Sequence, residues 1–188
     1  MQLWFTSDRH LSHENIIRYQ NRPFANAKEM DEALVDYHNA LVKPEDHVYN
    51  LGDISMMRGG RVQQELFCNQ VRKFNGHKRL LLGNHDHFPI EVYLRAGFEK
   101  IYATWRGIDN ILLSHVPIHP DSMSTALANV HGHTHGSSDE PPIKAADRDG
   151  VVRVKPYINI SVERTDYKPL TLEDLHQRIR LAKEKALC

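Results

Sequence analysis

The sequence predicts an α/β domain, with helices outside a mixed sheet or a pair of sheets. Two observations support this class. In the first half of the chain, short apolar runs typical of strands alternate with patterns typical of helices. Between residues 97 and 133, apolar runs follow one another closely and favour successive strands. At 188 residues, the length suits one compact domain covering residues 1–188.

Four of the predicted strands stop at polar residues. These strands cover residues 2–6, 47–51, 79–82 and 110–113, and they run into Ser7-Asp8, Gly52-Asp53, Gly83-Asn84 and Ser114-His115. Ligand sites in open α/β sheets gather at the ends of strands, where loops converge. A ligand-binding or catalytic site is therefore expected at these strand ends.

Three helices are predicted, over residues 26–42, 61–74 and 171–186. The first and last begin with the spacing of a capping box, at Asn26 with Glu29 and at Thr171 with Asp174. The side chains expected on the apolar faces are Met30, Leu34, Tyr37 and Leu41 of the first helix and Val62, Leu66, Val71 and Phe74 of the second. Residues 137–150 show no period and predict a surface excursion before a strand over residues 151–160.

Composition argues against several classes of protein. Lys and Arg total 24 and so do Asp and Glu, so no net charge attracts nucleic acid, and duplex DNA is not an expected partner. No apolar run reaches the roughly 18 residues of a membrane span, and no basic leader opens the chain, so we expect a cytoplasmic protein without membrane contact. The two cysteines, Cys68 and Cys188, are too far apart for a C-x-x-C motif and are expected to be reduced.

The 13 histidines are the unusual feature of the composition, and several stand beside Asp, Asn or Gly. Residues two apart in a strand project from the same face, so Asp8 with His10, or His133 with His135, can reach one point. Either pair alone is more often an ordinary loop sequence than a ligand pair. The full set favours a ligand site over ordinary loop sequence, because five blocks fall in order at predicted strand ends. These blocks are Asp8-x-His10, Gly52-Asp53, Gly83-Asn84-His85-Asp86, His115 and Gly132-His133-x-His135.

At these five blocks, the chain resembles the calcineurin-like metallophosphoesterase superfamily. Residues 16–24, 48–53 and 159–169 are similar to its small phage and bacterial branch. The resemblance implies a four-layer α/β/β/α sandwich of two mixed sheets flanked by helices. It also implies two metal ions, the first held by Asp8, His10, Asp53 and His135 and the second by Asp53, Asn84, His115 and His133.

The donor types fit transition metals independently of the resemblance. Imidazole nitrogens mixed with carboxylate and amide oxygens suit Mn²⁺, Fe or Zn²⁺ better than Ca²⁺ or Mg²⁺. We expect Mn²⁺, with Fe, Zn, Ni or Co as alternatives. Two ions about 3.5 to 4 Å apart can bind a bridging hydroxide that attacks phosphorus, and the same ions neutralise phosphate charge.

Protonation of the leaving group is assigned by the resemblance to His85, with Asp86 as the carboxylate that orients it. The alternative for His85 is a structural turn residue beside Asn84. Arg9 lies inside the first block, where strand alternation favours a structural position over substrate contact. The remaining histidines are read as outer contacts of the site or as surface and helix residues: His13, His38, His47, His77, His87, His119, His131 and His176.

The leading functional hypothesis is a phosphodiesterase acting on small nucleotide-like esters. Phosphomonoesterase (phosphatase) activity and nuclease activity are alternatives within the same fold, and short single-stranded oligonucleotides are alternative substrates. A binding scaffold without hydrolysis is the alternative from another class, disfavoured because every motif residue is present. The sequence contains no G-x-S-x-G or P-loop motif that would indicate other hydrolytic chemistry.

Overall fold

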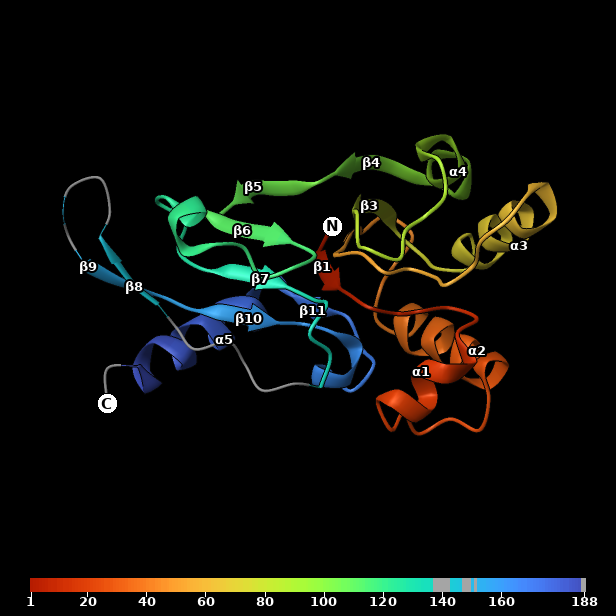
Figure 1. The fold of residues 1–188 in the computed structure, drawn as a ribbon, viewed down its shortest axis with the longest axis horizontal. Coiled ribbons are helices and arrows are strands. Elements are labelled where there is room, and N and C mark those ends of the chain that lie inside the picture. Colours follow the sequence, from red (N-terminus) through yellow and green to blue (C-terminus); the bar gives the residue numbers. More distant parts are fainter. Residues whose placement is uncertain (137–142, 147–149, 151, 187–188) are drawn as a thin grey trace.

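Two mixed β-sheets form the centre of this computed structural model, which describes residues 1–136, 143–146, 150 and 152–186 (Figure 1). The first sheet has the order β11 (Leu170–Thr171), β1 (Leu3–Thr6), β2 (His47–Asn50), β3 (His77–Leu81), β4 (Phe98–Tyr102). Its strands β1 to β4 are parallel and β11 is antiparallel.

The second sheet has the order β10 (Tyr157–Asn159), β7 (Asn129–His131), β6 (Ile111–Ser114), β5 (Thr104–Ile108). Strands β10, β7 and β6 are parallel, and β5 pairs with β6 in the antiparallel sense. Strands β8 (Ile143–Ala146) and β9 (Val152–Lys155) pair with each other and extend away from both sheets (Figure 1).

Helices α1 (Glu14–Tyr19), α2 (Ala27–Asn39), α3 (Arg61–Val71) and α4 (Ile90–Ala96) cover the outer face of the first sheet. Their apolar side chains pack with Leu80 and Phe98 of that sheet. Between the sheets, Phe5 and Leu81 meet Leu113 and other apolar residues of the second sheet, and α5 (Leu172–Lys185) packs against the same core.

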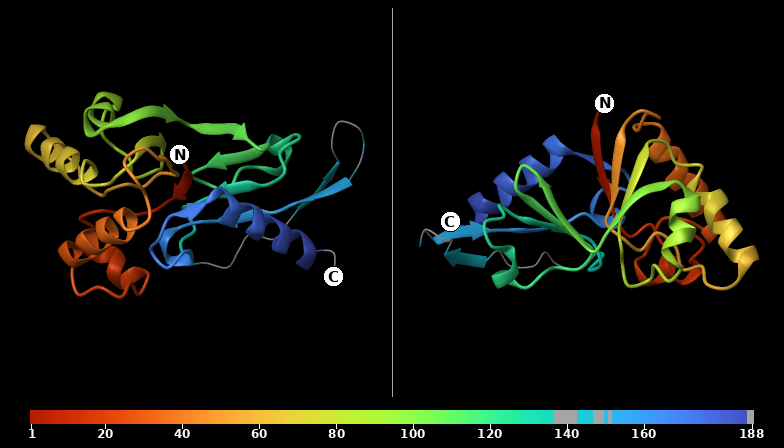
Figure 2. Two further views of the ribbon diagram at one scale, coloured as in Figure 1. Left: turned by 180° about the vertical axis from the view of Figure 1, so that it is seen from behind. Right: turned by 90° about the horizontal axis from the view of Figure 1, so that it is seen from above.

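The outer face of the second sheet is covered by the short 3-10 helix η1 (Pro120–Met123), whose Met123 packs on Leu112 and Tyr157. The two sheets open as a V when viewed from above (Figure 2). The predicted α/β sandwich of two mixed sheets flanked by helices is therefore confirmed. Among the residues described, no helix has the length and hydropathy of a membrane span.

The predicted apolar faces of two helices were partly wrong. Tyr37 and Leu41 of the first helix region are 39% and 41% exposed, and Val62 and Leu66 of α3 are 68% and 52% exposed. The buried stripe of α2 is Met30, Leu34 and His38, while α3 buries Phe67, Cys68 and Val71. Apolar spacing chose Tyr37 over His38 because it could not anticipate the polar partners that allow a histidine to be buried.

The predicted strand over residues 151–160 is broken into β9 and β10. Pro156 separates them, because proline has no N–H to donate to a ladder. Its carbonyl accepts a hydrogen bond from Asn129 N at 3.0 Å, where the chain enters the second sheet. The stretch 137–150, predicted as irregular, contains strand β8, and its other residues except Gly150 lie outside the described parts, as does Cys188.

Arg9 has the structural position that strand alternation favoured. Its guanidinium is buried, lies 4.1 Å from the ring centroid of Phe74 and contacts His38 Nδ1 at 2.9 Å. Nε2 of His38 lies 3.0 Å from Asn75 O, which accepts. Since arginine can only donate, His38 accepts at Nδ1, carries its proton at Nε2 and is neutral.

Burial and the charge of Arg9 lower the pKa of His38 from 6.5 to about 3. Below pH 6.5, His38 therefore binds a proton in the unfolded chain but not in the folded chain. His38 thus lowers the free energy of unfolding as pH falls from about 6.5 toward 3. We predict that His38→Gln, which retains an acceptor and a donor, removes about 3 kcal/mol of the decrease in unfolding free energy between pH 7.5 and 4.5.

Urea unfolding at several pH values measures this difference. His119→Gln is the matched control, since His119 is largely exposed, and it is expected to leave the pH dependence of the wild type. Equal slopes for His38→Gln and the wild type would contradict a neutral, buried His38.

Candidate metal centre

The strand ends singled out in the sequence meet at one edge of the sandwich. Strands β1, β2 and β3 of the first sheet are parallel, as are β6, β7 and β10 of the second. The arrowheads of β6, β7 and β10 point toward β1 (Figure 1). The loops after these strands bring together all seven predicted ligands: Asp8, His10, Asp53, Asn84, His115, His133 and His135.

The first group of donor atoms belongs to Asp8, His10 and His135, and these atoms lie within 4.8 Å of one another. His135 Nε2 is 3.8 Å from Asp8 Oδ1. Both ring nitrogens of His10 are buried without a hydrogen-bond partner among the described residues, and burial lowers its pKa to about 3. A neutral imidazole with unsatisfied buried nitrogens is the form of histidine that binds a metal ion.

The second group is Asp53, His115 and His133, again with donor atoms within 4.8 Å of one another. His115 Nε2 is 3.3 Å from Asp53 Oδ2. Asn84 joins this group, since its Oδ1 is 2.9 Å from His115 Nε2 and 2.9 Å from His133 Nδ1. One carboxylate oxygen, one amide oxygen and two imidazoles thus face one another.

Asp53 connects the two groups. Its Oδ2 lies 3.5 Å from His10 Nε2 of the first group and 3.3 Å from His115 Nε2 of the second. Burial raises the pKa of this carboxyl, but the hydrogen bond and charge of His115 outweigh burial and hold the pKa at about 2. Burial lowers the pKa of His115, but its hydrogen bond to Asp53, the charges of Asp8 and Asp53 and its hydrogen bond to Leu51 O outweigh burial and raise the pKa to about 9.

Five of the seven predicted ligands have a left-handed backbone. The φ values are 58° at Asp8, 52° at His10, 52° at Asp53, 67° at His133 and 49° at His135. Non-glycine residues seldom adopt this conformation, and each instance stores strain that the surrounding structure must hold. Such strain concentrates at functional sites, so the backbone marks these loops independently of their side chains.

Glycines precede several ligands because the loops pass too close for a Cβ. At Gly132, a Cβ would overlap Ser7 Oγ and Asp8 Oδ2. At Gly52, where φ is +90°, it would lie 2.6 Å from His115 Nδ1. The Gly-Asp and Gly-His pairs of the sequence are therefore requirements of loop packing around the carboxylates.

The loop after β10 also reaches the centre, and the sequence reasoning did not include it. Ser161 Oγ donates to Asp8 Oδ2 at 2.9 Å, and Glu163 Oε1 lies 3.2 Å from His135 Nδ1. A carboxylate on the second nitrogen of a ligand imidazole fixes the ring and leaves Nε2 free for a metal. Polar residues at alternate positions, Asn159-x-Ser161-x-Glu163, were the signal that could have found this loop.

Arg22 is a second residue that the sequence reasoning missed. Its guanidinium is buried, donates to Glu163 Oε1 at 2.6 Å and donates to the backbone carbonyls of Asp8 and Arg9 at 2.8 Å each. Arg22 thus connects the loop of Asp8 to Glu163, which lies 141 residues after Arg22 in the sequence. No spacing in the sequence indicates such a contact.

The predicted role of Asp86 as the partner of His85 needs correction. Its oxygens accept from the backbone N–H groups of Gly83 at 2.8 Å, Asp53 at 2.9 Å and Ile54 at 3.1 Å. Burial raises the pKa of Asp86 to about 6, while these donors favour the carboxylate. Asp86 thus fixes the loop that carries Asp53 and occupies its oxygens with main-chain donors instead of an imidazole.

His85 lies next to the first group, with its ring centroid 5.4 Å from that of His10. Its Nδ1 is buried without a hydrogen-bond partner among the described residues, and its backbone N–H donates to Asp53 Oδ1 at 2.8 Å.

His87 contacts Arg58, His119 is largely exposed, and His131 is buried with Nδ1 2.8 Å from Gly132 O. These three lie outside both donor groups.

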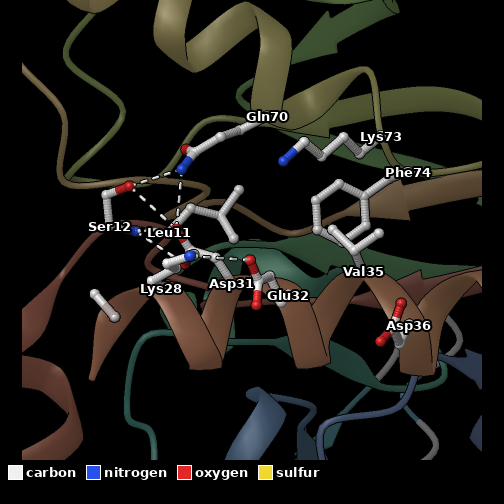
Figure 3. A pocket seen from close by; sticks show the side chains of 11 residues that line it. Leu11, Ser12, Lys28, Asp31, Glu32, Val35, Asp36, Gln70, Lys73 and Phe74 are labelled. Atoms are coloured by element: carbon white, nitrogen blue, oxygen red, sulfur yellow. Dashed lines mark hydrogen bonds and ion pairs between the residues drawn. The ribbon is translucent and has the colours of Figure 1, made fainter. Parts of the chain in front are cut away.

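A groove of about 520 Å³ lies behind the first ligand loop, lined by residues of α2 and α3 (Figure 3). Asp31 accepts from Ser12 N at 3.0 Å and from Gln70 Nε2 at 2.9 Å, and Gln70 also donates to Ser12 Oγ. Figure 3 shows these three side chains joined at one end of the groove. They hold the left-handed turn at Ser12, two residues after His10.

Curated relatives match along most of the chain. The uncharacterized protein MJ1445 of Methanocaldococcus jannaschii is 33% identical over 177 residues, which is 92% of this chain and 88% of that protein. The gene 66 protein of Mycobacterium phage L5 is 30% identical over 162 residues, covering 70% and 76%. The gene 66 protein of Mycobacterium phage D29 is 31% identical over 163 residues, covering 71% and 78%. No family model matches the chain.

Among solved structures, the crystal structure of AQ665, a protein of unknown function from Aquifex aeolicus, has a TM-score of 0.66. It is 26% identical and covers 94% of this chain and 98% of that one. Nuclease MPE of Pseudomonas putida is 18% identical with a TM-score of 0.49, covering 81% and 67%. A likeness at that level says nothing about the chemistry of this chain.

Proposed function

We propose that this chain, which belongs to the family of the archaeal protein MJ1445 and the mycobacteriophage gene 66 proteins, is a phosphodiesterase that uses two divalent metal ions. One observation carries the proposal: two groups of metal-ligand side chains face each other across the single carboxylate of Asp53. This arrangement and the five ordered motifs together support membership of the calcineurin-like superfamily.

The residues fit two resident ions. His10 offers buried nitrogens without a hydrogen-bond partner among the described residues, and Asn84 offers an amide oxygen facing two imidazoles. Asp8, His10, Asp53 and His135 would hold one ion, and Asp53, Asn84, His115 and His133 the other. When bound, such ions activate water and neutralise the charge of a phosphate ester. The nitrogen and oxygen donors support Mn²⁺ as the proposed ion.

The side chains around the ligands then have separate tasks. Glu163 and Ser161 hold His135 and Asp8 in place. Asp86 fixes the Asp53 loop through three backbone N–H groups. His85 has a buried ring nitrogen without a hydrogen-bond partner in the described part of the chain, and we assign it the proton that the leaving oxygen requires.

The proposed substrates are small nucleotide-like phosphodiesters, and short single-stranded oligonucleotides extend the same class. The equal numbers of basic and acidic side chains support small substrates over duplex DNA. The cytoplasm is the proposed compartment, supported by the two cysteines without C-x-x-C spacing.

We predict that the purified protein with Mn²⁺ hydrolyses bis(nitrophenyl) phosphate faster than nitrophenyl phosphate, and that a chelator abolishes both reactions. A strong preference for the monoester would overturn the assignment as a diesterase. Hydrolysis that is indifferent to chelation and to Mn²⁺ would overturn the role of metal.

We predict that His85→Asn retains metal content but lowers kcat about 100-fold on diesters with alkoxide leaving groups. The loss is expected to be much smaller on nitrophenyl esters, because nitrophenolate departs without protonation. His119→Asn is the control, since His119 is largely exposed and lies outside both donor groups. Equal losses on both kinds of ester would count against His85 as the acid.

A further inference from the structure

Arg9, Arg22 and Arg58 lie in or contact the loops of the candidate metal centre, and the first two make buried contacts within the protein. Arg9 is buried against Phe74 and His38, and Arg22 is buried against Glu163 and backbone carbonyls. Neither is available to a substrate. The third, Arg58, is exposed in the loop between β2 and α3, five residues after Asp53.

Arg58 ends a row of side chains that leads outward from the first donor group. Its Nη2 donates to His87 Nε2 at 2.6 Å. The His87 ring centroid is 5.9 Å from that of His85, and the His85 centroid is 5.4 Å from that of His10. The order from the centre outward is therefore His10, His85, His87 and Arg58.

The contact with His87 positions the guanidinium and leaves its other N–H donors available. A guanidinium has five N–H donors, and the only described partner of Arg58 is His87. An arginine held in this way is suited to a phosphate or carboxylate, which it binds through parallel N–H donors. Because His87 accepts at Nε2, it is neutral when it holds Arg58, so the pair presents a single positive charge.

The order of the row places Arg58 on the leaving-group side of a bound substrate. If His85 protonates the leaving oxygen, groups farther out along the row face the leaving alcohol. We infer that Arg58, held by His87, is a specificity residue that binds an anionic group on the leaving alcohol. The preferred substrates are then phosphodiesters whose leaving nucleoside carries a further phosphate. This inference rests on the proposed function of the metal centre.

The probes are three dinucleotides with one scissile diester: TpT, its 5′-phosphorylated form and its 3′-phosphorylated form. Hydrolysis of each with Mn²⁺ gives kcat and KM for the wild type, Arg58→Gln and Arg61→Gln. Arg61 is the matched control, because it is an exposed arginine three residues away at the start of α3.

The wild type is expected to prefer the form whose additional phosphate lies on the leaving nucleoside over TpT in kcat/KM by about tenfold, as one charge-assisted contact gives. Arg58→Gln is expected to remove most of that preference through KM, while Arg61→Gln retains it. His87→Ala is expected to reduce the preference by less, since the guanidinium remains.

A wild type without preference among the three dinucleotides would overturn the inference and leave the diesterase proposal standing. The same would follow if Arg58→Gln kept the preference, or if Arg61→Gln lost it equally, since the effect would then be one of general charge. Failure to hydrolyse any dinucleotide or nitrophenyl diester would overturn the proposed function and this inference with it.

Discussion

The rest of the site depends on one carboxylate, that of Asp53, which stands between imidazoles from two sheets. Oδ2 faces His10, carried by the loop after β1, and His115, carried by the loop after β6. Oδ1 accepts from the backbone of His85 after β3. A buried charge is tolerated only with such partners, so the position of Asp53 fixes how the two sheets meet at this edge.

The convergence of these loops requires strained backbone conformations and close contacts between loops. Left-handed conformations at Asp8, His10 and Asp53 place successive side chains toward the centre, and glycine at 52 and 132 lets loops approach where a Cβ would collide. Hydrogen bonds from outside the centre hold these conformations, through Asp86 to the Asp53 loop and through Arg22 to the Asp8 loop. The strain is therefore located where the surrounding sandwich is stiff enough to maintain it.

The sequence predicted the parts of this structure that depend on short-range pattern. Apolar runs located strands β1, β2, β3 and β6, and polar residues at their ends supplied five of the seven predicted ligands that the structure brings together. The other two, His133 and His135, come from the Gly-His-x-His block after β7. Prediction failed where burial depends on distant partners. His38 is buried because Arg9 and Asn75 satisfy its nitrogens, and Glu163 contacts His135 because β10 lies beside β7. Adjacency in sequence paired Asp86 with His85, whereas the oxygens of Asp86 accept hydrogen bonds from backbone N–H groups.

The central claim, that Asp53 is shared by two metal ions, is tested most directly by anomalous diffraction from crystals grown with Mn²⁺. The account predicts two anomalous peaks per chain, one beside Asp8, His10 and His135 and the other beside Asn84, His115 and His133, with Asp53 between them and touching both. A single peak, or two peaks of which only one contacts Asp53, would contradict it.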